Sequence, residues 1–158
     1  MSLAQVAVSH TILSSPPEAG AFLAREVLEK LGAAVPDVLI LFASPAFDYA
    51  TLLTAVQAGC APGILVGCSS AGEFSGCGDA NASASVMAIR GDDMRFNAAV
   101  GRALRADPLH AIDQVMPVFT GASHTDFPFR CALVMTDALA GYTDDMIHEL
   151  TVRTGGTY

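Results

Sequence analysis

The side chains best suited to chemistry lie in one short stretch, directly after an apolar run. Ile64–Val66 is followed by a thiol, two hydroxyls and a carboxylate, with glycines between them: Gly67, Cys68, Ser69, Ser70, Gly72 and Glu73. A short apolar run of this kind is typical of a strand buried on both faces, in the middle of an α/β sheet. Glycine lets another group approach the backbone closely, and α/β proteins bind ligands at the carboxyl ends of such strands. We therefore predict a small-ligand site at residues 67–73.

These side chains leave more than one kind of chemistry open. Cys68, on a sharp turn after a strand, has the placement of a nucleophile, but a cysteine at a strand end is also commonly an inert small hydrophobic group. Catalysis would need a base nearby, and the four histidines are scattered along the sequence. Ser69 and Ser70 can donate to a ligand carboxylate or bond their own turn, and Glu73 can bind an ammonium group or lie in solvent. The acidic pairs and thiols lack the spacing of a metal site, and no phosphate-loop motif indicates a cofactor.

Two further strand ends supply candidates for the same site. Val38–Ala43 and Cys131–Thr136 are apolar runs, and each is followed by a polar residue, Ser44 and Asp137 respectively. If these strands run parallel to the first, their ends gather at one edge of the sheet, so we add Ser44 and Asp137 to the predicted ligand-binding residues. Asp48 is better suited to cap the helix that follows it.

The elements that must position these residues follow from the apolar spacing. Helices are expected at roughly Pro16–Leu31 and Tyr49–Ala58, each between two strands. Residues 83–101 have the pattern of two strands joined by a turn at Gly91–Met94, which indicates an antiparallel hairpin. The predicted fold is α/β, with a mixed, mainly parallel sheet, flanking helices and one antiparallel hairpin. We expect residues 1–158 to form a single domain that is incomplete at its carboxyl end, where the sequence stops at a Gly-Gly loop.

Composition excludes several classes of partner. Eight basic residues against sixteen acidic ones give a net charge of -8, which would repel a phosphate backbone, so we expect no nucleic acid. No apolar stretch approaches the ~18 residues that span a bilayer, and the first basic residue is Arg25, so neither membrane insertion nor a secretory signal is expected. Four cysteines without CxxC spacing are typical of reduced thiols in a cytoplasmic protein. With 52% hydrophobic and 15% charged residues, some apolar surface should stay uncovered, which leaves a homo-oligomer open.

The sequence also resembles a known family. The resemblance lies in Phe42–Pro45 with Asp48, in Val66–Glu73, in Ser85–Ile89 and in Asp137–Leu139. The run Gly67–Glu73, GCSSAGE, is similar to the GCSTAGE signature of the FIST family, the F-box and intracellular signal transduction proteins, and the chain resembles their amino-terminal FIST domain. This resemblance implies a cytoplasmic sensory domain that binds a small molecule such as an amino acid and acts on a signalling output module. Two alternatives stay open: a small thiol-dependent enzyme that uses Cys68, and a protein-interaction scaffold without a small ligand.

Overall fold

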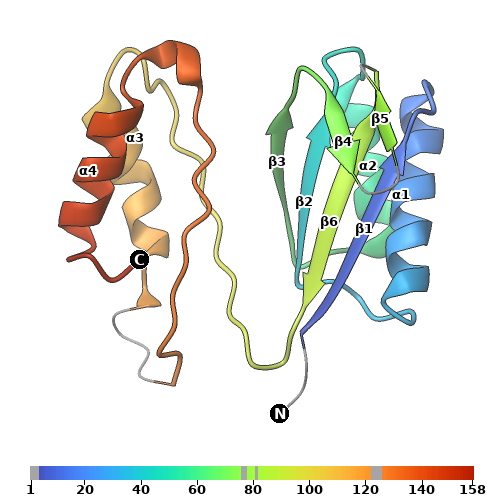
Figure 1. Ribbon diagram of the computed structural model, residues 1–158, viewed down its shortest axis with the longest axis horizontal. Coiled ribbons are helices and arrows are strands. Elements are labelled where there is room, and N and C mark those ends of the chain that lie inside the picture. The colour runs from blue at the N-terminus through green and yellow to red at the C-terminus, as the bar shows by residue number, and fades with distance from the viewer. Residues whose placement is uncertain (1–3, 76–77, 81, 122–125) are drawn as a thin grey trace. The chain divides into compact units, whose positions relative to one another are not determined.

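The computed structural model describes residues 4–75, 78–80, 82–121 and 126–158, and of residues 73–75, 78–80 and 138 it describes the backbone alone (Figure 1). The chain divides into two compact units, one up to Phe96 and one from Asn97 onward. Each unit is built around its own group of buried side chains. The expectation of one domain across residues 1–158 stays a prediction.

The first unit is a mixed sheet with two helices. Its elements are β1 (Gln5–Thr11), α1 (Pro16–Lys30), β2 (Val38–Ala43), α2 (Tyr49–Cys60), β3 (Ile64–Ser69), β4 (Glu73–Ser75), β5 (Gly78–Ala80) and β6 (Ala84–Arg90). The main sheet has the order β1-β6-β2-β3, in which β2 and β3 are parallel and the other two pairings are antiparallel. Strands β4 and β5 form a separate antiparallel pair. The α/β class, the mixed sheet and the flanking helices are confirmed, with fewer parallel pairings than the sequence indicated.

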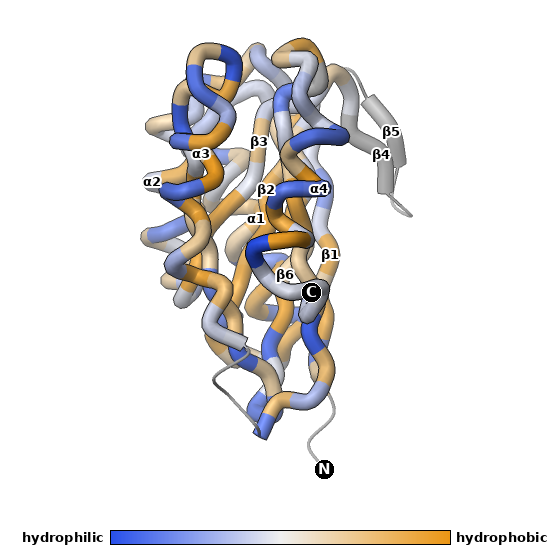
Figure 2. Tube along the Cα trace, turned by 90° about the vertical axis from the view of Figure 1, so that its left-hand side faces the viewer, coloured by the Kyte–Doolittle hydropathy of each residue, from blue (hydrophilic) through white to orange (hydrophobic). Residues whose placement is uncertain are grey.

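Both helices of this unit pack on one face of the main sheet (Figure 1). The core lies between them, where Leu23 and Val27 of α1 and Leu52 of α2 meet Leu39 and Leu41 of β2, all of them buried. Figure 2 shows β2 and β6 mostly in the hydrophobic colour, as expected for strands that have a neighbour on each side. The apolar spacing of α1 and α2 is therefore explained by burial against this sheet.

The two helices approach each other closely through small residues. A Cβ atom added at Gly20 would lie 2.6 Å from the Cβ atom of Ala55, and one added at Gly59 would lie 2.5 Å from the Cβ atom of Ala24. Both distances are too short for real carbon atoms, so the glycines are required by the helix contact.

The opposite side of the sheet, here called the far face, carries the alternate side chains of each strand. They are Val6, Val8 and His10 of β1, Ser85, Met87 and Ile89 of β6, Val38, Ile40 and Phe42 of β2, and Ile64, Val66 and Cys68 of β3. Most are apolar, and the polar ones stand together at one end. At that end the carboxyl ends of β1, β2 and β3 meet the amino end of β6.

The second unit is a small helical cluster. It contains α3 (Pro108–Val115), the 3-10 turns η1 (Met116–Val118) and η3 (Ala138–Ala140), and α4 (Thr143–Arg153). Ile112, Met146 and Leu150 form its buried core. The Arg153 guanidinium donates to Glu149 and Asp113, and these hydrogen bonds raise the pKa of Arg153 above its usual range.

Three expectations about strands were wrong. Residues 95–101 form no strand, because β6 is already paired with β1 on one side and β2 on the other, so the hairpin expected at residues 83–101 has no free edge. Cys131–Thr136 also forms no strand, and Leu133 within it is 65% exposed. β3 pairs only with β2 among the described strands and is therefore an edge strand, whose residues 64–66 are half-buried and not enclosed on both faces.

Candidate functional site

The parallel pairing of β2 and β3 brings two of the predicted segments together. Ala43 is the partner of Ser69 in the register, and the backbone N–H of Ser70 donates to the carbonyl oxygen of Ala43 at 3.0 Å. Ser44 and Ser70 therefore leave the sheet side by side. Because this strand pair ends in register, the serines after it lie at one edge, as the sequence indicated for parallel strands.

The hydrogen bonds of Ser44 at this edge are made within the protein. Its side chain is buried, its hydroxyl oxygen accepts from the N–H of Ala46 at 3.3 Å, and its own N–H donates to the carbonyl oxygen of Ser83 at 2.9 Å. Ser44 thus holds the turn after β2 against the start of β6. The structural role fits this residue better than direct contact with a ligand.

Gly67 is required by the neighbouring strand. A Cβ atom at this position would collide with the carbonyl oxygen of Leu41, a backbone atom that cannot move without disturbing β2. The group that approaches the backbone of Gly67 closely is therefore the neighbouring strand β2. Gly67 and Gly72 are both exposed to solvent.

The strand pleat separates two of the candidate side chains. Cys68 belongs to the far face. Ser69 projects to the opposite face, the same face as Leu65, which packs on the core beside α1 and α2. Both residues are exposed. A ligand over the far face therefore meets Cys68 first, and it reaches Ser69 only around the end of β3.

The far face also contains a histidine, but at the wrong distance for a catalytic pair with Cys68. Cys68, Phe42, Ser85 and His10 form one row across the four strands. Three strand spacings separate the ends of that row, roughly 14 Å. Nucleophilic catalysis by a thiol requires a base within hydrogen-bond reach, so His10 does not supply it in this arrangement.

The three acidic candidates differ in what the structure says about them. The side chain of Glu73 lies outside the described residues, and its backbone begins β4. Asp48 is the N-cap residue of α2, and its carboxylate accepts from the hydroxyl of Thr51. Asp137 lies in the second unit, where its carboxylate accepts from the N–H of Leu139 at 2.9 Å and caps η3. Asp137 thus has a local structural role that the sequence did not reveal.

A comparison with protein-family models decides the family. The model of the FIST N domain matches residues 37–157, which include β2, β3, β6 and the signature run. The chain belongs to the FIST N-domain family. FIST domains are sensory domains of signal-transduction proteins. Neither a curated protein nor a solved structure matches the sequence.

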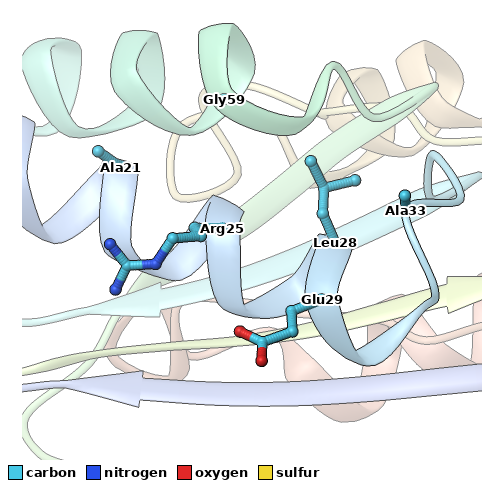
Figure 3. Close-up of a pocket in the computed structure, with 6 residues that line it drawn as sticks. All are labelled: Ala21, Arg25, Leu28, Glu29, Ala33 and Gly59. Atoms are coloured by element: carbon cyan, nitrogen blue, oxygen red, sulfur yellow. The ribbon is translucent and has the colours of Figure 1, made fainter.

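One hollow of this FIST domain lies elsewhere, between α1 and α2 (Figure 3). Its volume is about 410 Å³, and it is lined by Ala21, Arg25, Leu28, Glu29, Ala33 and Gly59. Leu28 points toward α2. None of the predicted ligand-binding residues lines this hollow, so it is separate from the signature segment.

Two residues that the sequence did not single out have the most unusual environment at the site edge. Both ring nitrogens of His10 and the hydroxyl oxygen of Ser85 are shielded from solvent and have no hydrogen-bond partner in the structure. The one sequence signal is the alternation Val6, Val8, His10, which places a polar residue on an otherwise apolar face. Their pairing could not be read from the sequence, because β1 and β6 are far apart along the chain.

The remaining observations limit the chemistry of the described part. No group of three metal-ligating side chains occurs within residues 4–75, 78–80, 82–121 and 126–158. Within those same ranges, no helix has the length and apolar character needed to cross a membrane.

Proposed function

We propose that this FIST domain binds a small amino-acid-like metabolite without catalysing a reaction, at the edge where β2 and β3 end. The ligand would be surrounded by Gly67, Cys68, Ser69, Ser70, Gly72 and Glu73. Ser44 would support the site by holding the turn after β2 in place. The observation that supports this most is the in-register end of the parallel pair, which gathers Ser44 and Ser70 and leaves the signature segment exposed beside them. The carboxyl ends of parallel strands are the usual ligand positions in α/β proteins.

The chemistry proposed is recognition of the two charged ends of an amino acid. Hydroxyls and backbone N–H groups suit a carboxylate, and the single carboxylate of the signature, Glu73, suits an ammonium group. The N–H of Ser70 already donates to Ala43, so the hydroxyls of Ser69 and Ser70 would contribute more than that amide. Binding would act on a cytoplasmic output module, which requires that the ligand favours one of two conformations.

Binding is favoured over thiol catalysis by the geometry of the far face. Cys68 is exposed, but the histidine in its row lies roughly 14 Å away, at three strand spacings. An enzyme would need a base in contact with the thiol. A scaffold without a small ligand would require none of these groups, and the experiment below separates it from a sensor.

A thermal-shift screen of the full chain against the L-amino acids tests the proposal. A ligand at a hundred times its Kd stabilises the folded state by about 2.7 kcal/mol. For a chain of this size that corresponds to a rise in Tm of about 5–10 °C. Ser70→Ala should weaken the binding roughly 10- to 100-fold, because a hydrogen bond to a charged ligand group is lost.

Thr54→Ala is the matched control, because it also removes one hydroxyl, from the exposed side of α2, where that hydroxyl donates to its own helix. This variant should keep the wild-type affinity. A screen in which no amino acid raises the Tm would contradict the sensor proposal. Equal affinity in the Ser70→Ala and wild-type chains would remove the site from the end of β3.

A further inference from the structure

His10 and Ser85 form a polar pair that lacks any partner. They are direct neighbours in the antiparallel register of β1 and β6. Nδ1 and Nε2 of His10 and Oγ of Ser85 are all shielded from solvent, and none makes a hydrogen bond. Shielded polar groups are nearly always hydrogen-bonded in folded proteins, and one left without a partner calls for an explanation. Two such groups side by side indicate a missing polar partner common to both.

The pair belongs to the same edge of the sheet as the signature segment. His10 and Ser85 continue the row that begins with Cys68 and Phe42. After β3 the chain passes through residues 70–72 to β4, and β4 lies against β1 and β6, the two strands that carry the pair (Figure 1). The signature segment therefore crosses from the end of β3 to the strands of His10 and Ser85.

From this arrangement we infer that His10 and Ser85 are ligand-binding residues that hold an acid group, a carboxylate, of the molecule sensed by this domain. The inference rests on the proposed function in that the acid group is part of the same ligand. Ser85 can donate its O–H and His10 a ring N–H, so two donors converge on one acceptor. An anion fits better than a cation because none of the described far-face side chains of β1, β6, β2 and β3 is acidic and able to neutralise a positive charge.

The position of the pair also restricts the shape of the ligand. Ser85 stands two strand spacings from β3, roughly 10 Å. A molecule that reaches both Ser70 and this pair must carry polar groups at that separation, which is more than the α-amino and α-carboxylate groups of one amino acid span. The class favoured is therefore an elongated acid, such as a short peptide with a free carboxylate.

NMR of the histidine ring nitrogens in the full chain tests the pair directly, with sodium acetate as the probe. The His10 signals are assigned by their loss in His10→Gln. Acetate should shift them saturably, whereas methylammonium chloride and sodium chloride of equal ionic strength should not. Ser85→Ala should weaken the acetate effect at least about tenfold, since one of two hydrogen bonds to a charged group is lost. The exposed His110 of α3 is the internal control, and its signals should not respond.

Each result decides between the two proposals. If acetate leaves the His10 ring unchanged, or Ser85→Ala does not alter the response, the acid-binding pair is refuted. If amino acids stabilise the chain through Ser70 while His10 stays silent, the sensor proposal holds and the pair does not. If acetate shifts His10 although no amino acid raises the Tm, the pair holds and the amino-acid proposal fails. If His10 and Ser85 bond each other, Ser85→Ala changes the ring signals without acetate and acetate has no effect, which also refutes the inference.

Discussion

At one point of the contact between α1 and α2 there is room for a single methyl group, which Ala24 of α1 supplies opposite Gly59 of α2. Moving this methyl group from α1 to α2 tests the packing. In Gly59→Ala the new Cβ atom would lie 2.5 Å from the Cβ atom of Ala24, while the next nearest atom, the Cα of Ala24, is 3.9 Å away. The clash thus involves a single atom. Overpacking typically costs about 1–3 kcal/mol, and alanine gains up to about 1 kcal/mol over glycine in a helix. We expect Gly59→Ala alone to destabilise the first unit by about 0–2 kcal/mol.

The reverse change, Ala24→Gly, should cost about 2 kcal/mol, since it loses helix propensity and the burial of one methyl group. In the double variant the propensity terms cancel and the methyl group is supplied from the other helix. We therefore expect the double variant to lie within about 1 kcal/mol of the wild type, with a coupling energy of about 2–4 kcal/mol.

Native-state hydrogen exchange of the Leu39 and Leu41 amides measures this, because they report the opening of the first unit alone. The comparison is the free energy of opening in the wild type, both single variants and the double variant. Additive effects of the two changes would refute the packing argument. A double variant less stable than either single variant would refute it as well.

Three further outcomes are expected. Iodoacetamide should label the exposed Cys68 well before Cys60, because burial raises the pKa of the Cys60 thiol and so lowers its thiolate fraction. Labelling of Cys60 should therefore need a higher pH. Peptide mapping by mass spectrometry measures both labelling rates, and equal rates would contradict this expectation. Asp37→Ala should lower the free energy of unfolding by about 1–3 kcal/mol in urea titrations, because the N–H of Gly91 loses its carboxylate acceptor at 2.9 Å. An unchanged urea midpoint of unfolding would contradict this. Leu23→Ala, at a fully buried position, should cost about 2–5 kcal/mol in the same titration, whereas a loss below 1 kcal/mol would mean that α1 packs loosely.

The sequence predicted best those elements whose signals are local. α1 begins at Pro16 and ends one residue before Leu31, and β2 covers Val38–Ala43, as their spacing and apolar runs indicated. Even the turn at Gly91 is present, since the N–H of Met94 donates to the carbonyl oxygen of Gly91. The hairpin failed because pairing is decided by distant residues: β1 occupies the edge of β6 that the following segment would have needed.

The candidate site shows the same division. The parallel pair that gathers Ser44 and Ser70 follows from the order of strand and helix, which the sequence shows clearly. The edge position of β3 does not, because an apolar run has the same appearance at an edge and in the centre of a sheet. The pair of His10 and Ser85 arises from a register between the first and last strands of the unit, and no local pattern specifies such a register.

Gly67 has a consequence for how the signature run is presented. Shifting β3 by one residue along β2 would bring the Cβ atom of Val66 or Cys68 against the Leu41 carbonyl, where only a hydrogen atom has room. Such a slip would also exchange the sides to which the thiol and its following hydroxyl project. The missing methyl group of Gly67 thus fixes the register of β3 on β2. The register in turn determines which signature side chains project toward the helices and which project to the far face.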